Sequence, residues 1–254
     1  MLLRPMQKVI KRLARSGLFF ISKLESVFDK AYLIDDVPLS KQINPERWAE
    51  YVTSNVKSQN GKKLRVLEIG SREVTGPSKM REKFSDAEYV GFDYYAARNV
   101  DVVGDVHRLS SYFEGEEKFD IIYTVACFEH FAMPWVVALE ISKMLKVGGV
   151  VSVHTHFSFG AHERPWNFFQ FSDMGLRVLF SSSMGFECID AGMSNPMVGR
   201  YSRLADKQLR NVPVKGLYCG SEYLGRKVRD EKDFDWNKVS VGDIVSGTTY
   251  PSPR

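Results

Sequence analysis

The 254-residue sequence predicts an α/β protein built on a doubly wound, mostly parallel sheet. Between residues 64 and 156, short apolar runs alternate with segments of helical periodicity, as in a parallel sheet with crossover helices. Gly70 follows the first of these runs and Asp93 ends the second, at positions where such sheets bind ligands. The hydrophobic content of 44% and charged content of 26% are ordinary for a soluble protein with one enzyme-sized domain and appendages.

Residues 1–40 are expected to form a basic N-terminal helical arm. Residues 1–30 hold seven Lys or Arg against two acidic residues, a net charge of +5 that leaves −1 for the rest of the chain. Three interpretations stay open: a helix that packs on the domain or on a second copy in a homodimer, a peripheral contact of residues 1–30 with an anionic membrane, or a cleavable transit peptide. The nearly neutral remainder argues against a nucleic-acid partner.

Residues 41–229 are predicted to form the main domain. Asn44-Pro45 begins its first helix as N-cap and first-turn proline, and Asn60-Gly61 ends it. A later helix, Pro134–Leu145, is closed by Gly148-Gly149. The first five strands are expected at Leu64–Ile69, Glu88–Asp93, Val100–Gly104, Phe119–Thr124 and Val150–His156.

The pattern changes after residue 157. His162–Phe171 is a loop of large aromatic side chains, and Ser172 caps a further helix. Phe186–Ala191 and Leu217–Leu224 complete a seven-stranded sheet. Residues 192–215 between them are interpreted as an insertion or lid, and residues 230–254 as a C-terminal tail.

The three cysteines, Cys127, Cys188 and Cys219, are far apart in the sequence and form no CxxC pair. This excludes a thiolate zinc site and a disulfide framework, and it indicates a reducing compartment. The sequence has no apolar run near the ~20 residues that a membrane-spanning helix needs. A cytoplasmic location is therefore expected, with membrane association left to the basic arm.

The loop after the first strand favours a nucleoside without phosphates. A dinucleotide site needs the G-x-G-x-x-G pattern, whereas only Gly70 and Gly76 occur here, six positions apart, and the P-loop Lys is absent. Asp93 ends the second strand, where a carboxylate can accept hydrogen bonds from both hydroxyls of a ribose. S-adenosylmethionine is a nucleoside of this kind.

Residues 66–157 resemble the class I S-adenosylmethionine-dependent methyltransferases of the broad "type 11" group, which have a Rossmann-like fold. The similarity rests on the Val66–Ser71 run, Asp93, Gly104-Asp105, the Phe119–Ile122 strand with Cys127–His130, and Leu145–Gly149. It implies that Glu68 and the loop at Gly70 and Ser71 hold the amino-acid end of the cofactor. It further implies that Asp93 binds the ribose, and that Asp105 and Val106 recognise adenine.

The sequence departs from the family pattern in two places. Arg72 and Glu73 are bulky where small residues are usual, so the cofactor tail is expected to sit differently. In the aromatic loop, Asn167 and Gln170 replace an acid and a base. This is either an ion pair exchanged for an amide pair or the mark of a changed acceptor site.

Histidines are the candidates for a general base, because their pKa lies near neutral pH. His162 is expected first, with His130 and His156 as alternatives. His154 shares a strand face with His156, so one of the two is expected to be a core residue. No metal is expected, because His154, His156 and His162 lack suitably spaced carboxylates.

The resemblance favours O-methylation of a sugar or glycan precursor in polysaccharide biosynthesis. Methylation of another small metabolite, a protein or RNA acceptor, and a catalytically degenerate binding subunit stay open as alternatives.

Overall fold

The computed structural model describes residues 16–17, 30–41, 45–56, 61–74 and 76–244. By its internal contacts the chain divides into two compact units, one of residues 38–195 and 218–254, the other of residues 1–37 and 196–217. Most of the predicted basic arm lies outside the described residues, including residues 1–15 and 18–29, for which a membrane contact is one interpretation. The expected N-cap Asn44 also lies outside them. No helix in the described ranges combines the length and apolar character that a bilayer crossing requires.

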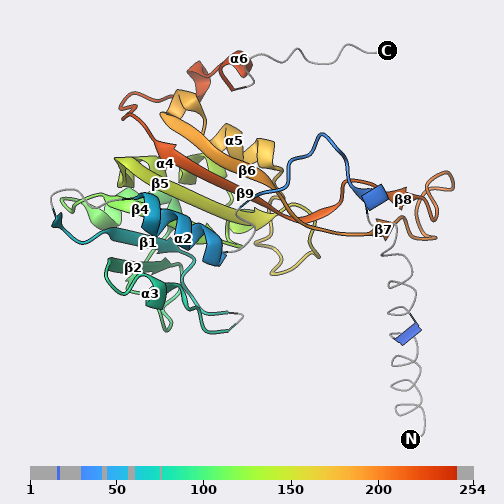
Figure 1. Ribbon diagram of the computed structural model, residues 1–254, viewed down its shortest axis with the longest axis horizontal. Helices are drawn as coiled ribbons and strands as arrows, with labels where there is room; N and C mark the ends of the chain where they lie inside the picture. The colour runs from blue at the N-terminus through green and yellow to red at the C-terminus, as the bar shows by residue number, and fades with distance from the viewer. Residues whose placement is uncertain (1–15, 18–29, 42–44, 57–60, 75, 245–254) are drawn as a thin grey trace, which may run out of the picture. The chain divides into compact units, whose positions relative to one another are not determined.

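The larger unit is built on a seven-stranded sheet with the order β3-β2-β1-β4-β5-β9-β6 (Figure 1). The pairs that join β3, β2, β1, β4 and β5 are parallel, and β9 is antiparallel to β5. The predicted seven-stranded, mostly parallel, doubly wound sheet is confirmed. Its strands are β1 (Arg65–Ile69), β2 (Glu88–Asp93), β3 (Val102–Val103), β4 (Phe119–Val125), β5 (Leu145–His156), β6 (Phe186–Pro196) and β9 (Tyr218–Lys227).

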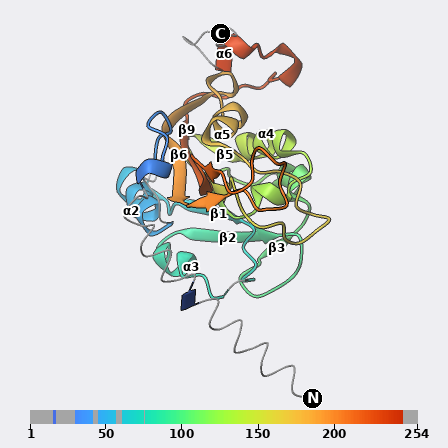
Figure 2. The ribbon, with the colours of Figure 1, turned by 90° about the vertical axis from the view of Figure 1, so that its right-hand side faces the viewer.

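Helices cover both faces of this sheet, as Figure 2 shows. On one face α2 (Pro45–Asn55) buries Trp48 and Val52 against Val66 and Tyr123. On the other face α4 (Pro134–Met144), α5 (Asp173–Leu179) and the 3-10 segment η3 (Val106–Phe113) cover a larger core. The short elements are α3 (Met80–Lys83), η4 (Phe128–His130), η5 (Ser182–Met184), η6 (Trp236–Lys238) and α6 (Val241–Ile244).

Local sequence signals account for several boundaries. Ser172 caps α5, since its Oγ accepts a hydrogen bond from the Gly175 N–H at 3.1 Å. The third strand begins at Val102, later than expected. The Asp101 carboxylate accepts a hydrogen bond from the Gly91 N–H at 2.7 Å, and this contact keeps Asp101 in the turn before the strand. The helix bounds at Pro134 and Met144 agree with the prediction within one residue.

Two strands are each five residues longer than the sequence indicates, and β9 continues past its predicted end at Leu224 to Lys227. The fifth begins at Leu145, which pairs with Phe119 before the register shifts, so the glycine pair expected to close the helix lies inside a bulged strand. The sixth continues from Phe186 to Pro196 and takes in residues 192–196 of the expected insertion. Beyond the expected domain end at residue 229, Phe234 and Trp236 pack on the larger core.

The smaller unit contains a two-stranded antiparallel sheet of β7 (Gly199–Arg200) and β8 (Pro213–Val214). Next to β8, the Gly216 N–H donates to the Tyr32 carbonyl oxygen at 2.7 Å. A Cβ built on Gly216 would lie 2.4 Å from Ile34 Cδ1, so residues 32–34 pack closely on this segment.

Candidate active site

The carboxyl ends of the central parallel strands meet at one edge of the sheet. In register, Ile69 lies beside Phe92 of β2 and beside Thr124 of β4, and Asp93 lies beside Val103 of β3. The strand order reverses between β1 and β4, which makes this the topological switch point where open α/β sheets bind ligands. The predicted residues after strands one, two and three are therefore brought to this edge.

Gly70 makes the turn that opens this edge. Its φ of +83° is in the left-handed region that favours glycine, and its N–H donates to the Phe92 carbonyl oxygen at 2.8 Å. A Cβ built on Gly70 would lie 2.0 Å from Cys127 Sγ. A side chain at this position would therefore collide with the protein itself.

The turn is packed tightly behind Gly70. Ser71 is 2% exposed, its carbonyl oxygen accepts from the Asn99 amide at 3.0 Å, and a Cβ built on Gly91 would lie 2.7 Å from Ser71 Oγ. Ser71 Oγ is a buried oxygen with no hydrogen-bond partner among the described residues. Ser71 thus joins the loop to β2, and its role at the cofactor stays a prediction.

Glu68 is a buried carboxylate on the α2 side of the sheet. It accepts hydrogen bonds from the Tyr89 hydroxyl and from the Asn99 amide, the latter at 3.1 Å, and Tyr89 is hydrogen-bonded in turn to Tyr123. Burial raises the pKa of Glu68, and the hydrogen bond from Tyr89 opposes this rise. These contacts fix the carboxylate in a protein network, and its predicted contact with the cofactor remains a prediction.

Asp93 is largely buried at the end of β2. Its oxygens accept from the backbone N–H groups of Arg72 and Tyr95 at 3.2 and 3.1 Å, and the Arg72 guanidinium lies 3.7 Å away. An ionised carboxylate has about four acceptor positions, so capacity for the two hydroxyls of a ribose remains. Arg72, the bulky residue of the loop, therefore holds Asp93, the residue predicted to bind the ribose, in place.

Asp105 caps η3 at the next strand end. Its carboxylate accepts from the His107 N–H at 3.0 Å and lies 2.7 Å from His107 Nδ1. Burial raises the pKa of Asp105, but these hydrogen bonds outweigh that effect and lower it overall. The Val106 side chain is 7% exposed and belongs to the core, so only its backbone is placed to meet a ligand.

The hydrogen-bonding groups at this edge of the sheet suit a nucleoside that carries no phosphate. The carboxylates of Asp93 and Asp105 end neighbouring strands, where they would repel a phosphate but accept hydrogen bonds from hydroxyl and amino groups. The positive φ of Gly70 leaves a turn without a side chain beside them.

A second group of side chains follows β4 and β5. Ala126 ends the turn after β4 with a φ of +51°, which is strained for an L-residue, and its N–H donates to the His154 carbonyl oxygen at 2.8 Å. Burial raises the pKa of the next residue, Cys127, to about 12. The Cys127 thiol therefore stays protonated at neutral pH and does not act as a nucleophile.

Glu129 is the buried centre of this group. Its side chain is fully buried, Oε2 accepts from the Thr155 hydroxyl at 2.6 Å, and Oε1 lies 2.6 Å from His156 Nδ1. Burial raises the pKa of Glu129, but the contacts with His156 and Thr155 lower it overall, so the carboxylate is ionised. The sequence showed Glu129 as part of a motif and not as a site residue, although an acid next to a candidate histidine was the available signal.

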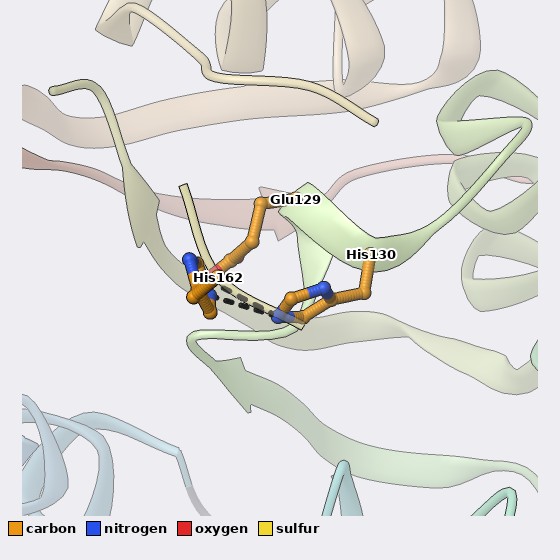
Figure 3. Close-up of side chains that lie close together, drawn as sticks. All are labelled: Glu129, His130 and His162. Carbon is orange, nitrogen blue, oxygen red and sulfur yellow. Dashed lines mark hydrogen bonds and ion pairs between the residues drawn. The ribbon is translucent and has the colours of Figure 1, made fainter. Parts of the chain in front are cut away.

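His130 and His162 face each other across this group, as Figure 3 shows. Their Nε2 atoms are 3.2 Å apart. His130 Nδ1 lies 2.8 Å from the Trp166 carbonyl oxygen, and His162 Nδ1 lies 2.9 Å from that of Gly160. The ring centroids of His156 and His162 are 5.3 Å apart, so the structure brings all three predicted histidines together.

The two alternating histidines of β5 differ in their partners. His156 meets Glu129, whereas His154 Nε2 lies 3.9 Å from Glu222 Oε1 on β9. Burial lowers the pKa of His154, and the neighbouring His156 lowers it further. His154 is thus the β5 histidine that lies outside the cluster.

The aromatic loop is held against the cluster by its backbone. The N–H groups of Phe168 and Phe169 donate to the Glu129 carbonyl oxygen at 2.8 and 3.2 Å, and Phe171 N–H donates to that of His156 at 2.9 Å. Phe169 packs against the core, whereas Trp166 and Phe168 are 58% and 44% exposed. The loop therefore has both an anchoring and an exposed aromatic side.

Gln170 stabilises the same loop in a way that the sequence did not predict. Its amide accepts from the Phe159 N–H at 3.4 Å and donates to the Phe159 carbonyl oxygen at 3.2 Å. The Phe159 ring in turn stacks on His156, with centroids 4.1 Å apart. Gln170 thus pairs with the backbone of Phe159 and not with Asn167, which corrects the interpretation as an exchanged amide pair.

Comparison with known proteins identifies the family of the domain. A sequence model described as "Methyltransferase domain" matches residues 40–183, more than half of the chain. A search of curated protein sequences finds no match.

Similar solved structures share the fold at low sequence identity. The DszA carbon methyltransferase is 13% identical with a TM-score of 0.52, over 73% of this chain and 53% of that one. TehB from Haemophilus influenzae is 13% identical with a TM-score of 0.44, over 70% and 60%. The 1,6-didemethyltoxoflavin-N1-methyltransferase of Burkholderia thailandensis, solved with S-adenosylhomocysteine, is 14% identical with a TM-score of 0.47, over 86% and 90%.

The chain thus spans little more than half the length of DszA and 60% of TehB. The family match covers the strands that carry Gly70, Asp93 and Asp105. It therefore includes the edge of the sheet whose carboxylates suit a nucleoside without phosphate. The chain belongs to the methyltransferase-domain family, and its seven-stranded, mostly parallel sheet has a Rossmann-like fold.

Proposed function

We propose that this chain is an S-adenosylmethionine-dependent methyltransferase that transfers a methyl group to a hydroxyl of a sugar or glycan precursor. The observation that carries the proposal is the convergence of His130, His156 and His162 around the buried Glu129, at the carboxyl ends of β4 and β5. This cluster lies on the other side of the switch point from Asp93 and Asp105. A cofactor bound along β1 to β3 would direct its methyl group toward it.

On this proposal the cofactor is held by Gly70, Asp93 and Asp105. Asp93 would accept hydrogen bonds from the ribose, and Asp105 with the Val106 backbone would contact the adenine. Bound S-adenosylmethionine supplies a sulfonium-activated methyl group for direct displacement. Positioning the acceptor oxygen next to that methyl accounts for most of the catalysis.

The acceptor proton would pass to a histidine of the cluster, and the geometry favours His156. The Glu129 carboxylate at 2.6 Å from Nδ1 orients the ring and stabilises the imidazolium that forms when Nε2 takes a proton. His130 and His162 are the other two candidates, because the Nδ1 of each meets a carbonyl oxygen, so their Nε2 atoms, which lie 3.2 Å apart, are the ring nitrogens left to take a proton.

The exposed rings of the aromatic loop support a ring-shaped acceptor. Trp166 and Phe168 lie edge to face with centroids 6.1 Å apart, next in sequence to the carbonyl that holds His130. Aromatic faces stack on the apolar face of a sugar and exclude water from the displacement.

A donor-consumption assay of the full chain tests this proposal, with nucleotide sugars, glycans, amines and carbon acids as separate acceptor classes. We expect turnover with a hydroxyl-bearing sugar, and a loss of about 10²–10⁴-fold in His156→Ala with cofactor affinity unchanged. His154→Gln is the matched control on the same strand face and should keep its activity. Turnover only with amines or carbon acids would reject the O-methylation proposal.

A further inference from the structure

The pair formed by His130 and His162 has an unusual arrangement of hydrogen atoms. Each Nδ1 lies at hydrogen-bond distance from a backbone carbonyl oxygen, 2.8 Å for His130 and 2.9 Å for His162. A carbonyl oxygen only accepts, so each Nδ1 carries the hydrogen. In the neutral rings, both Nε2 atoms then present lone pairs to each other at 3.2 Å. Such a contact is repulsive unless a cation lies between the two atoms.

The carboxylates around this pair are placed to hold a cation. Glu129 Oε1 is 4.0 Å from His130 Nε2, and the ligand atoms of Glu129, His130 and His162 all lie within 4.8 Å of one another. Glu129 Oε1 is buried and forms no hydrogen bond of good geometry in the described part of the chain, although His156 Nδ1 is near. Glu163 Oε2 is 3.9 Å from His130 Nε2 on the outer side.

We infer that Glu129, His130 and His162 bind one divalent transition-metal ion, with Zn²⁺ as the first choice. Two imidazole nitrogens on a tetrahedral zinc ion lie about 3.4 Å apart, close to the spacing found here. Two histidines with one carboxylate make a known zinc ligand set that leaves a fourth position open. In metal sites the second ring nitrogen of a histidine typically donates to a carbonyl or carboxylate, as both do here.

The Glu129 carboxylate is also held in a fixed orientation by its neighbours. Its Oε2 accepts from the Thr155 hydroxyl at 2.6 Å, whereas Oε1 lies 2.6 Å from His156 Nδ1 and 4.0 Å from His130 Nε2, on the side of the metal-binding histidines (Figure 3). His162 comes from the aromatic loop, and Glu129 and His130 come from η4, so the site joins two segments of the chain. Backbone hydrogen bonds from Phe168 and Phe169 to Glu129 hold these segments together without a metal.

This inference deepens the proposed function and rests on it for its chemical role. A metal ion held by these three residues would bind the acceptor oxygen at its open fourth position and make the hydroxyl more acidic, so His156 would remove the proton more readily. No metal is expected from the sequence, because His154, His156 and His162 lack suitably spaced carboxylates there. The fold replaces the first two by Glu129 and His130.

Zinc binding to the tag-free full chain, freed of metal by a chelator, tests the inference. Calorimetry and native mass spectrometry should show one Zn²⁺ per chain, and His162→Ala should weaken that binding by more than ~100-fold. His154→Gln should bind as the wild type does. Unchanged melting of His162→Ala in the absence of metal would show that the variant is folded, because His162 lies on a loop.

Cobalt substitution provides a second readout that does not depend on activity. Co²⁺ should give visible absorption of a four- or five-coordinate site in the wild type, and Glu129→Gln should shift or remove it. Binding of Zn²⁺ that is equal in the wild type and in His162→Ala would overturn the inference and leave a shared proton between the histidines. Failure of the sugar assay with intact zinc binding would reject the acceptor and not the metal site.

Discussion

Gly70 allows the strain and the packing at the cofactor turn to be measured separately. In Gly70→Ala the new methyl group would occupy a residue with a φ of +83° and lie 2.0 Å from Cys127 Sγ. The left-handed conformation costs an L-residue about 1–2 kcal/mol. Overpacking against the thiol adds about 1–3 kcal/mol. We therefore expect the free energy of unfolding to fall by roughly 2–5 kcal/mol.

Cys127→Ala provides the matched background. Without Sγ, the nearest atom to the new methyl would be the Cβ of residue 127, at 3.4 Å, which is an ordinary contact. Only the conformational cost then remains, so Gly70→Ala should be less destabilising in this background by about 1–3 kcal/mol. Urea denaturation of the four proteins of the cycle measures this difference. Additivity of the two substitutions within ~0.5 kcal/mol would refute the packing argument.

Three further predictions concern other parts of the molecule. Ala126→Gly should raise the free energy of unfolding by up to ~1 kcal/mol, because glycine adopts the observed φ without strain; a loss of stability in thermal melts would contradict this. The pKa of His154 is lowered by burial and by His156, so protonation of the unfolded chain should reduce stability as the pH falls below 6.5; His154→Gln should flatten that decrease, and parallel profiles would speak against it. Removal of residues 1–29, which spares the Tyr32 contact, should leave cofactor binding intact and abolish flotation with anionic liposomes at low salt; no flotation of the full chain would leave the arm a packing element.

The sheet could be predicted because its signals are local. The apolar runs at β1, β2 and β4 and the cap at Ser172 fixed those elements within a residue or two. The bulge at the start of β5 could not be predicted, because it depends on the pairing of Leu145 with Phe119, residues brought together only by the fold.

The sequence predicts which residues lie at the site, but not which of them are in contact. Gly70, Asp93 and Asp105 follow strands, so the topology alone brings them to one edge of the sheet. The contact of Gly70 with Cys127 and the facing of His130 and His162 join residues 57 and 32 positions apart. The periodicity of a sequence does not indicate contacts between residues so far apart. For the same reason the sequence did not identify Glu129 as the centre of the histidine cluster.

The binding of S-adenosylhomocysteine to Asp93→Asn tests the central claim most directly. The amide keeps the size of the carboxylate but exchanges one acceptor oxygen for a donor and removes the charge, which costs about 1.5–3 kcal/mol for each charge-assisted hydrogen bond to the ribose. Calorimetry should therefore show an affinity at least ~10-fold weaker than that of the wild type, and Asp86→Asn, at an exposed aspartate on the turn before β2, should bind normally. Equal affinity of the Asp93→Asn variant and the wild type would show that the nucleoside does not bind at the end of β2.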